Sequence, residues 1–284
     1  MEFNIPTPIV EAVFMTASQA IDWGIIKHEI PSIWKNITQG EGIKVAILDS
    51  GWPYHIDLYN NILETKDFVS NNKDNESQGH GVSVAGVIAA EDNSFGVVGV
   101  APKVGIIYGR VLSNSGAGSA ENILKGLDYA IQSKVDIISL SFGARFAHNP
   151  LYEKIKEAYN KNIVVVSSAG NDKVEDSINY PAKWEEVISV GAVNEQGEIA
   201  DFCSKGYKID VYAPGVSVLS THLNNSYGCF SGTSFATPFI SGIVALGIAA
   251  RRKNAKKDLK PGKIRKILNT FPLSSFVKEM LNED

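Results

Sequence analysis

Three short segments carry residue types that together can perform nucleophilic catalysis. The apolar run at 45–48 ends in the acid Asp49, His80 lies between two glycines, and Ser234 follows Gly-Thr ahead of a long apolar run. A serine hydroxyl is a poor nucleophile unless a base such as histidine takes its proton. An acid can hold that histidine in the required tautomer. The residue types therefore predict a catalytic unit of Asp49, His80 and Ser234.

Each segment also has an ordinary structural explanation when it is taken alone. An Asp-Ser-Gly after a strand is commonly a turn, and Gly-Thr-Ser before an apolar run is a common helix N-cap. A histidine between glycines can simply begin a helix. The combination is more specific, because all three segments lie at strand ends or helix starts, where α/β sheets place their functional groups.

The elements that must position these residues follow from the alternation of apolar runs and helical patterns. Dense Val and Ile content is typical of parallel strands buried on both faces, and apolar residues three and four apart are typical of helices. Strands are predicted at 44–48, 104–112, 135–140, 163–167, 187–193 and 209–212, and helices at 80–90, 120–133, 152–161, 233–252 and 261–269. This order predicts an α/β fold with a mainly parallel central sheet flanked by helices.

Composition places the chain among folded globular proteins. It has 284 residues, 44% hydrophobic and 20% charged, with a net charge of −4. The two cysteines, Cys203 and Cys229, exclude a disulfide scaffold and are best interpreted as small apolar side chains. The mild acidity gives no reason to expect a nucleic-acid partner. The basic stretch at 251–266 fits a solvated surface near a helix end.

The location is predicted from two features of the sequence. The N-terminus has an acid at position 2 and lacks the basic start and apolar core of a secretory signal. The longest apolar stretch, 235–250, is interrupted by polar residues and a proline and is short for a membrane span. We expect a cytoplasmic protein with no membrane partner, and the oligomeric state stays open.

The motifs resemble those of the subtilisin-type serine proteases, the subtilase family. The order acid, histidine, serine is that of subtilisin, and the segment 164–171 resembles the oxyanion segment of the family. The similarity runs from about Gln19 to Ala250. It implies a three-layer subtilisin-like fold and a serine endopeptidase. By this resemblance His80 is the base, Asp49 orients it, and the Asn171 amide with the Ser234 backbone N–H stabilises the oxyanion.

The resemblance also implies where a polypeptide substrate binds. Two edge segments of the family hold an extended peptide, and a third segment forms a wall of the primary pocket. Glycines let two backbones approach closely, and strand addition supplies main-chain hydrogen bonds. The matching residues are Gly116, Ala117 and Gly118, then Ser141, Phe142 and Gly143, and for the wall Ala169 and Gly170.

A calcium site is implied by the loop at 90–98, which is similar to the calcium loop of the family. Calcium takes six to eight oxygen ligands, many of them carbonyls. The implied ligands are the side chains of Gln19, Asp57 and Asn93 and the carbonyls of Glu91, Phe95 and Val97. The same loop also fits a polar turn.

Residues 1–17 precede the alternating pattern and are predicted as a short N-terminal extension, a candidate propeptide, before a peptidase domain at 18–284. Intracellular subtilisins carry an extension with a Leu-Ile-Pro-Tyr-like motif across the cleft, and this chain keeps Ile5-Pro6. Proline lacks an N–H and fixes φ, so it can misplace a bond that would otherwise be cut. We expect the extension to inhibit the enzyme.

The predicted role is intracellular protein turnover or processing. One alternative is a dedicated leader peptidase that matures a lantibiotic precursor. Another is a catalytically silent pseudoprotease that binds peptides, although all four catalytic positions are intact.

Overall fold

A seven-stranded parallel sheet forms the centre of the computed structural model, which describes residues 1–5, 9–15, 18–69 and 79–283. All neighbouring strands in it run parallel. Their order across the sheet is β10 (Val211–Pro214), β9 (Val187–Val193), β8 (Val164–Ser168), β7 (Ile137–Leu140), β3 (Lys44–Ser50), β5 (Gly105–Leu112) and β4 (Ile62–Asp67).

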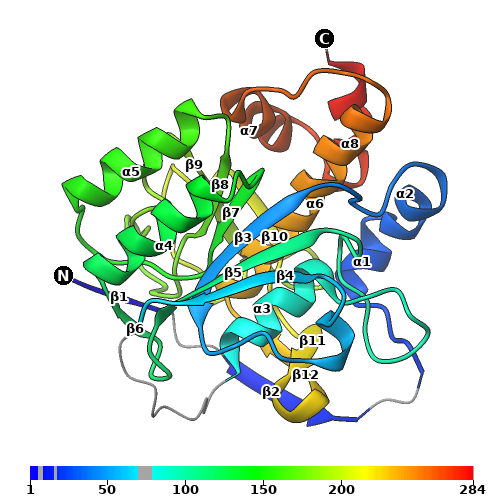
Figure 1. The fold of residues 1–284 in the computed structure, drawn as a ribbon, viewed down its shortest axis with the longest axis horizontal. Helices are drawn as coiled ribbons and strands as arrows, with labels where there is room; N and C mark the ends of the chain where they lie inside the picture. The colour runs from blue at the N-terminus through cyan, green and yellow to red at the C-terminus, as the bar shows by residue number, and fades with distance from the viewer. Residues whose placement is uncertain (6–8, 16–17, 70–78, 284) are drawn as a thin grey trace.

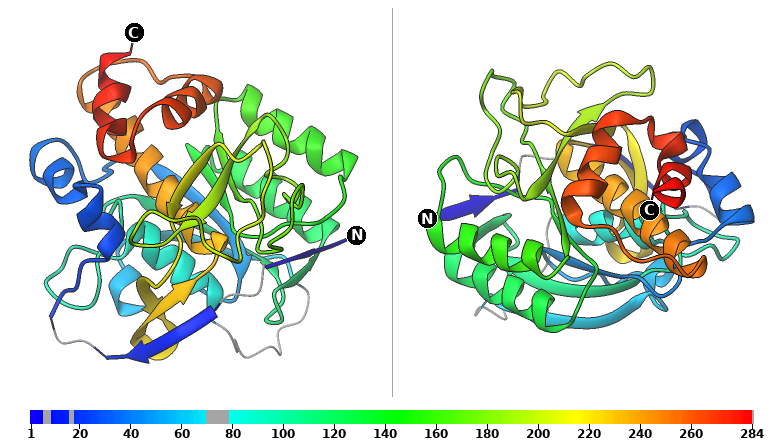
Figure 2. Two further views of the ribbon diagram at one scale, coloured as in Figure 1. Left: turned by 180° about the vertical axis from the view of Figure 1, so that it is seen from behind. Right: turned by 90° about the horizontal axis from the view of Figure 1, so that it is seen from above.

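Helices cover both faces of this sheet, as Figures 1 and 2 show. Side chains of β3 alternate between the two faces, as the period of a strand requires. Val45 and Ile47 pack with α3 (His80–Ala89) and α6 (Thr233–Lys253). Ala46 and Leu48 pack with α4 (Ala120–Gln132) and α5 (Asn149–Asn160). The three-layer α/β prediction is therefore confirmed.

Two small antiparallel sheets involve the N-terminal extension. In one, β1 (Glu2–Asn4) pairs with β6 (Ala117–Ser119). In the other, β2 (Ile9–Phe14) pairs with β12 (Ser226–Ser231), which also pairs with β11 (Val218–His222). Both described parts of the extension thus add a strand to the body of the protein (Figure 1).

Four further helices and two 3-10 turns complete the described part of the fold. They are α1 (Trp23–Lys27), α2 (Ile30–Asn36), α7 (Pro261–Thr270) and α8 (Leu273–Asn282), with short 3-10 turns η1 (Ile56–Leu58) and η2 (Leu223–Asn225). The sequence did not predict α1, α2, α8, β4, β11 or β12. β4, for example, is an edge strand, and its sequence Ile-Leu-Glu-Thr-Lys-Asp lacks the dense apolar content of its neighbours.

Helix α6 passes the length and hydropathy test for a membrane span, and every residue of that window is buried inside the protein. Two of its hydroxyl groups are satisfied within the helix: Thr237 Oγ1 donates to the Thr233 carbonyl and Ser241 Oγ to the Thr237 carbonyl. This burial is that of a core helix.

Candidate active site

Asp49 and His80 are joined by a hydrogen bond between two buried side chains. Asp49 lies near the end of β3, and His80 begins α3. His80 Nδ1 lies 2.8 Å from Asp49 Oδ1, which also accepts the Ser50 N–H at 2.7 Å. A carboxylate only accepts, so Nδ1 carries the proton and Nε2 is left as an acceptor. Nε2 is buried and has no hydrogen-bond partner among the described residues.

Gly79 lets the chain enter α3 at this point. Its φ is +63°, a left-handed conformation that suits glycine. A Cβ carbon there would lie 2.6 Å from the His222 ring. The sequence at the helix start therefore serves both the backbone turn and the close packing beside His80.

Ser234 lies in the first turn of α6, and its carbonyl is tied to the predicted substrate segment. Pro238 has no N–H to donate to the Ser234 carbonyl four residues earlier. That carbonyl instead accepts a hydrogen bond of 2.8 Å from Ser141 Oγ. The Ser234 hydroxyl is buried and has no hydrogen-bond partner in the described part of the chain. The ring of Phe235, the next residue, lies 5.6 Å from the His80 ring, so the histidine lies beside the start of α6.

Asn171 is oriented by Thr233. Its Oδ1 accepts hydrogen bonds from Thr233 N at 3.1 Å and from Thr233 Oγ1 at 2.9 Å, which directs Nδ2 away from the helix. Nδ2 and the Ser234 hydroxyl border one space beside Gly232, where a Cβ carbon would lie 3.3 and 3.0 Å from them. Thr233 was missed by the sequence reasoning, and its only signal was its place between Gly232 and Ser234.

The two predicted edge segments lie on either side of β1. Asn4 and Gly143 exchange two backbone hydrogen bonds of 3.0 Å, and Ile5 N donates to Gly116 O at 3.0 Å. β1 also pairs with Ala117 and Gly118. Residues 2–5 therefore lie as an extended strand in the place predicted for a substrate. The predicted proline, Pro6, lies outside the described residues.

Side chains anchor the extension at both ends. Phe3 is fully buried, and its ring meets Phe142 edge to face at 6.2 Å. In β2, the Glu11 carboxylate accepts hydrogen bonds from the hydroxyls of Ser217 and Ser231. The predicted pocket wall at Ala169 and Gly170 is buried and leads directly to Asn171.

The predicted calcium ligands gather around the buried Asp57 carboxylate. Its oxygens accept hydrogen bonds from Val97 N at 2.9 Å and from Asn93 Nδ2 at 2.7 Å. Burial raises the pKa of Asp57, and a hydrogen bond from Tyr227 opposes this effect. None of the ion pairs among the described residues involves Asp57. A buried carboxylate without a cation is costly, so this environment favours a bound cation.

Three other predicted ligand oxygens accept hydrogen bonds from amide groups. Gln19 Nε2 donates to the carbonyls of Glu91 at 2.8 Å and Val97 at 3.4 Å, and Phe95 N donates to Asn93 Oδ1 at 3.2 Å. If the Gln19 and Asn93 amides turned over, the group would present oxygens, the ligands that calcium prefers. No cluster of three or more His, Cys, Asp or Glu side chains in the described ranges could hold a metal. A cation here would therefore depend on carbonyl and amide oxygens.

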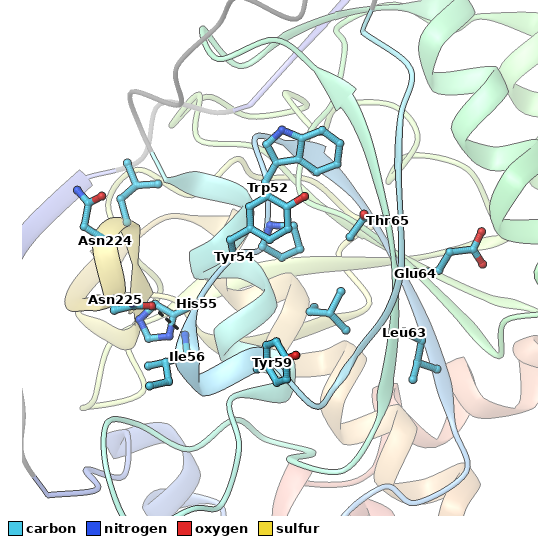
Figure 3. Close-up of a pocket in the computed structure, with 13 residues that line it drawn as sticks. Trp52, Tyr54, His55, Ile56, Tyr59, Leu63, Glu64, Thr65, Asn224 and Asn225 are labelled. Atoms are coloured by element: carbon cyan, nitrogen blue, oxygen red, sulfur yellow. Dashed lines mark hydrogen bonds between the residues drawn. The ribbon is translucent and has the colours of Figure 1, made fainter.

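A separate cavity of about 860 Å³ lies beside β4 and η2 and is lined by none of the predicted site residues. In Figure 3 it is bordered by Trp52 and Tyr54, whose rings stack at 5.7 Å. Asn225 Oδ1 accepts the Ile56 N–H at 2.9 Å and joins two sides of it. None of Asp49, His80 and Ser234 lines this cavity.

The two cysteines are not among the residues of the candidate active site. Cys203 is buried, and Cys229 lies on β12 opposite Ala12 of the extension. Burial raises the pKa of both thiols, and Glu11 and Asp22 add to the effect at Cys229. Both groups are therefore held as neutral thiols.

Comparison with known proteins gives one consistent result. Residues 40–272 match the model of the subtilase family. The chain is 38% identical over 267 residues to an intracellular serine protease of Paenibacillus polymyxa, covering 90% of this chain and 82% of the relative. It is 37% identical over 263 residues to the major intracellular serine protease of Bacillus subtilis, covering 88% and 82%. Subtilisin DY of Bacillus licheniformis is 38% identical over 234 residues, covering 81% and 85%. The chain therefore belongs to the subtilase family and is a subtilisin-type serine endopeptidase.

Proposed function

We propose that Asp49, His80 and Ser234 form the catalytic triad and that Asn171 stabilises the oxyanion. The observation that carries this proposal is the buried 2.8 Å hydrogen bond between His80 and Asp49 beside the start of α6. It leaves His80 Nε2 and the Ser234 hydroxyl as buried polar groups that lack partners in the described structure. His80 Nε2 can accept the hydrogen bond that the Ser234 hydroxyl can donate.

In the first step, His80 Nε2 takes the proton of Ser234 as Oγ attacks the peptide carbonyl. The Asp49 carboxylate stabilises the imidazolium that forms and keeps its ring oriented. His80 then gives the proton to the leaving amine, which departs as the acyl-enzyme forms. Water then attacks this ester with His80 again as the base, and His80 returns the proton to Ser234 Oγ as the bond to the acyl group breaks and the acid product leaves.

Negative charge develops on the carbonyl oxygen during each attack. The Asn171 side-chain amide borders the Ser234 hydroxyl, and the Ser234 backbone N–H lies in the first turn of α6. Both are donors that the fold holds in place before reaction, which lowers the cost of reorganisation. The N-terminal end of the helix adds a favourable potential for the anion.

A fluorophosphonate tests the proposal directly. We expect it to label Ser234 stoichiometrically and to abolish cleavage of an unfolded protein such as casein. Labelling at another residue, or cleavage that survives complete labelling, would exclude this assignment. A pseudoprotease that binds peptides would show neither labelling nor cleavage.

We further propose that residues 1–17 are a propeptide that inhibits the enzyme by occupying the substrate cleft. The pairing of β1 with both edge segments supports this, since it uses the backbone groups that a substrate strand would need. The second described part of the extension is held separately. There β2 pairs with β12, and the Glu11 carboxylate accepts hydrogen bonds from the hydroxyls of Ser217 and Ser231.

Phe3→Ala is expected to activate the full-length chain. Complete burial of a phenylalanine contributes about 1.5–3 kcal/mol, and 1.4 kcal/mol is a factor of ten in an equilibrium. The initial rate of the freshly purified protein should therefore rise at least about tenfold. Phe14→Ala is the matched control, because that ring is 37% exposed, and its rate should stay near that of the parent. Equal rates for both variants and the parent would argue against inhibition by β1.

We propose that a calcium ion binds here. Its ligands would be the side chains of Gln19, Asp57 and Asn93 and the carbonyls of Glu91, Phe95 and Val97. The buried Asp57 carboxylate supports this proposal, because a cation would offset the cost of its burial. When bound, calcium would supply rigidity to the loop that follows α3. It would take no part in bond cleavage.

Chelation should lower thermal stability. A ligand at about 100 times its Kd contributes about 2.7 kcal/mol, which is about 5–10 °C in Tm for a chain of this size. We expect EDTA to lower Tm by that amount in the fluorophosphonate-inhibited protein, where autolysis is absent. Asp57→Asn should remove the calcium dependence, whereas Asp201→Asn, at an exposed carboxylate, should keep it. A Tm that ignores both calcium and EDTA would count against the site.

Intracellular protein turnover or processing is the proposed role. Two relatives that match most of this chain are named intracellular serine proteases. We propose a cytoplasmic location on the same ground. A lantibiotic leader peptidase stays the alternative, and cleavage confined to one precursor would favour it.

A further inference from the structure

The cavity beside β4 and η2 adjoins both of the segments that carry Asp49 and His80. Trp52, which borders the cavity, follows Asp49 by three positions. Leu223, which also lines it, lies against Gly79, the residue before His80, because a Cβ carbon there would be 2.9 Å from Leu223 Cγ. A substrate held at the proposed triad is therefore only a short stretch of chain away from this cavity.

Exposed apolar side chains gather around the cavity. Four of the large apolar side chains that the fold leaves exposed line it, namely Tyr54, Ile56, Tyr59 and Leu63. Tyr59 is 81% exposed, and the ring of Tyr54 stacks on that of Trp52 (Figure 3). An apolar surface of this kind, around a cavity of about 860 Å³, is typical of an interaction site.

The cavity presents almost no charge near neutral pH. Burial lowers the pKa of His55 to about 4, so its ring is neutral there. Glu64 is the carboxylate of the lining, and in Figure 3 it points to the opposite side of β4 from Tyr54 and Tyr59. A charged group that entered the cavity would lose its hydration and gain no counter-ion. The lining therefore favours an apolar or aromatic side chain as the occupant.

The edge of β4 supplies backbone groups beside this lining. β4 is the last strand of the central sheet, and no other described strand pairs with its far edge. Successive N–H groups of a strand point to alternate sides, and Phe68 N donates to the Arg110 carbonyl of β5. The N–H and C=O of Thr65, three positions earlier, therefore point away from β5, and Thr65 also lines the cavity. An open edge beside apolar pockets is how many proteins bind an extended peptide by strand addition.

We propose that this cavity and the edge of β4 form a second binding site for the substrate protein. An extended segment outside the cleft pairs with β4 and places one or two apolar or aromatic side chains in the cavity. This inference rests on the proposed peptidase function of Ser234. No described residue of the N-terminal extension lines the cavity, so the site does not depend on removal of β1 or β2.

The test compares cleavage of casein, whose unfolded chain can reach both sites, with cleavage of a four-residue chromogenic peptide. Such a peptide spans at most about 14 Å and fills only the cleft. Tyr59→Ala should raise KM for casein at least about tenfold and leave kcat unchanged, since burial of one apolar side chain is worth about tenfold in an equilibrium. Thr65→Pro removes one edge donor without breaking the pairing with β5 and should raise KM for casein about fivefold. Both variants should cleave the peptide at the parent rate.

Tyr207→Ala is the matched control, because Tyr207 is 88% exposed and does not line this cavity. Its casein-to-peptide ratio of kcat/KM, measured in one preparation of the full chain, should equal that of the parent. A ratio that neither Tyr59→Ala nor Thr65→Pro changes, in enzyme that still cleaves the peptide, would overturn this inference alone. An equal loss on both substrates would also overturn it, because the cavity would then support the catalytic residues rather than bind substrate. A parent chain that shows neither labelling of Ser234 nor cleavage would overturn the proposed function and this inference with it.

Discussion

Ser234→Ala is expected to lower kcat by about 10⁶-fold, the loss known for removal of the nucleophile from subtilisin itself. In the proposed mechanism Ser234 supplies the atom that forms the acyl-enzyme, and the neighbouring Thr233 hydroxyl in the first turn of α6 is bonded to Asn171. His80→Ala should cost nearly as much, because without the base the hydroxyl keeps its proton. Activity on a peptide and labelling by a fluorophosphonate measure both effects.

The double variant Ser234→Ala/His80→Ala should be no less active than either single variant. Residues that act as one unit lose their joint contribution once, so their effects do not add. Ser241→Ala is the matched control. It is the same change two turns further along α6, where the hydroxyl bonds to Ser139 and the Thr237 carbonyl. Full activity in Ser234→Ala would contradict the assignment of the nucleophile.

The residues proposed as catalytic could be singled out because each is marked by its local sequence. Asp49 ends a run of apolar residues that predicts a buried strand. His80 follows a glycine and Ser234 follows a Gly-Thr pair, each at the start of an apolar helix. The positions of such residues depend on the alternation of strands and helices, which is a local property of the chain. The structure accordingly brings Asp49 and His80 to 2.8 Å.

Residues that act across the fold could not be predicted in this way. Thr233 matters because its hydroxyl meets Asn171, 62 positions earlier in the chain. Thr233 has no local signal, since an isolated threonine fits many turns and caps. The edge strand β4 was missed for the related reason that charged residues interrupt its pattern.

The contacts that hold the N-terminal extension could be predicted only in part from its sequence motif. Ile5-Pro6 led to the expectation that the extension inhibits the enzyme, but it gave no side chain that would hold the extension in place. In the structure Phe3, which no motif singled out, is the fully buried side chain of β1. Its ring packs against Phe142, which belongs to a predicted substrate segment.

Asn171→Leu is expected to lower kcat by about 10²–10³-fold with little change in KM, the effect known for the corresponding amide donor in subtilisin. Leucine keeps the size of the side chain and removes the donor, which acts on the oxyanion and hardly on the bound substrate. Thr233→Val removes one of the two hydrogen bonds that orient the amide and should cost about tenfold. In the Asn171→Leu background Thr233→Val should cost nothing further, because its effect passes through that amide. An additive loss would show that Thr233 acts on the reaction by another route.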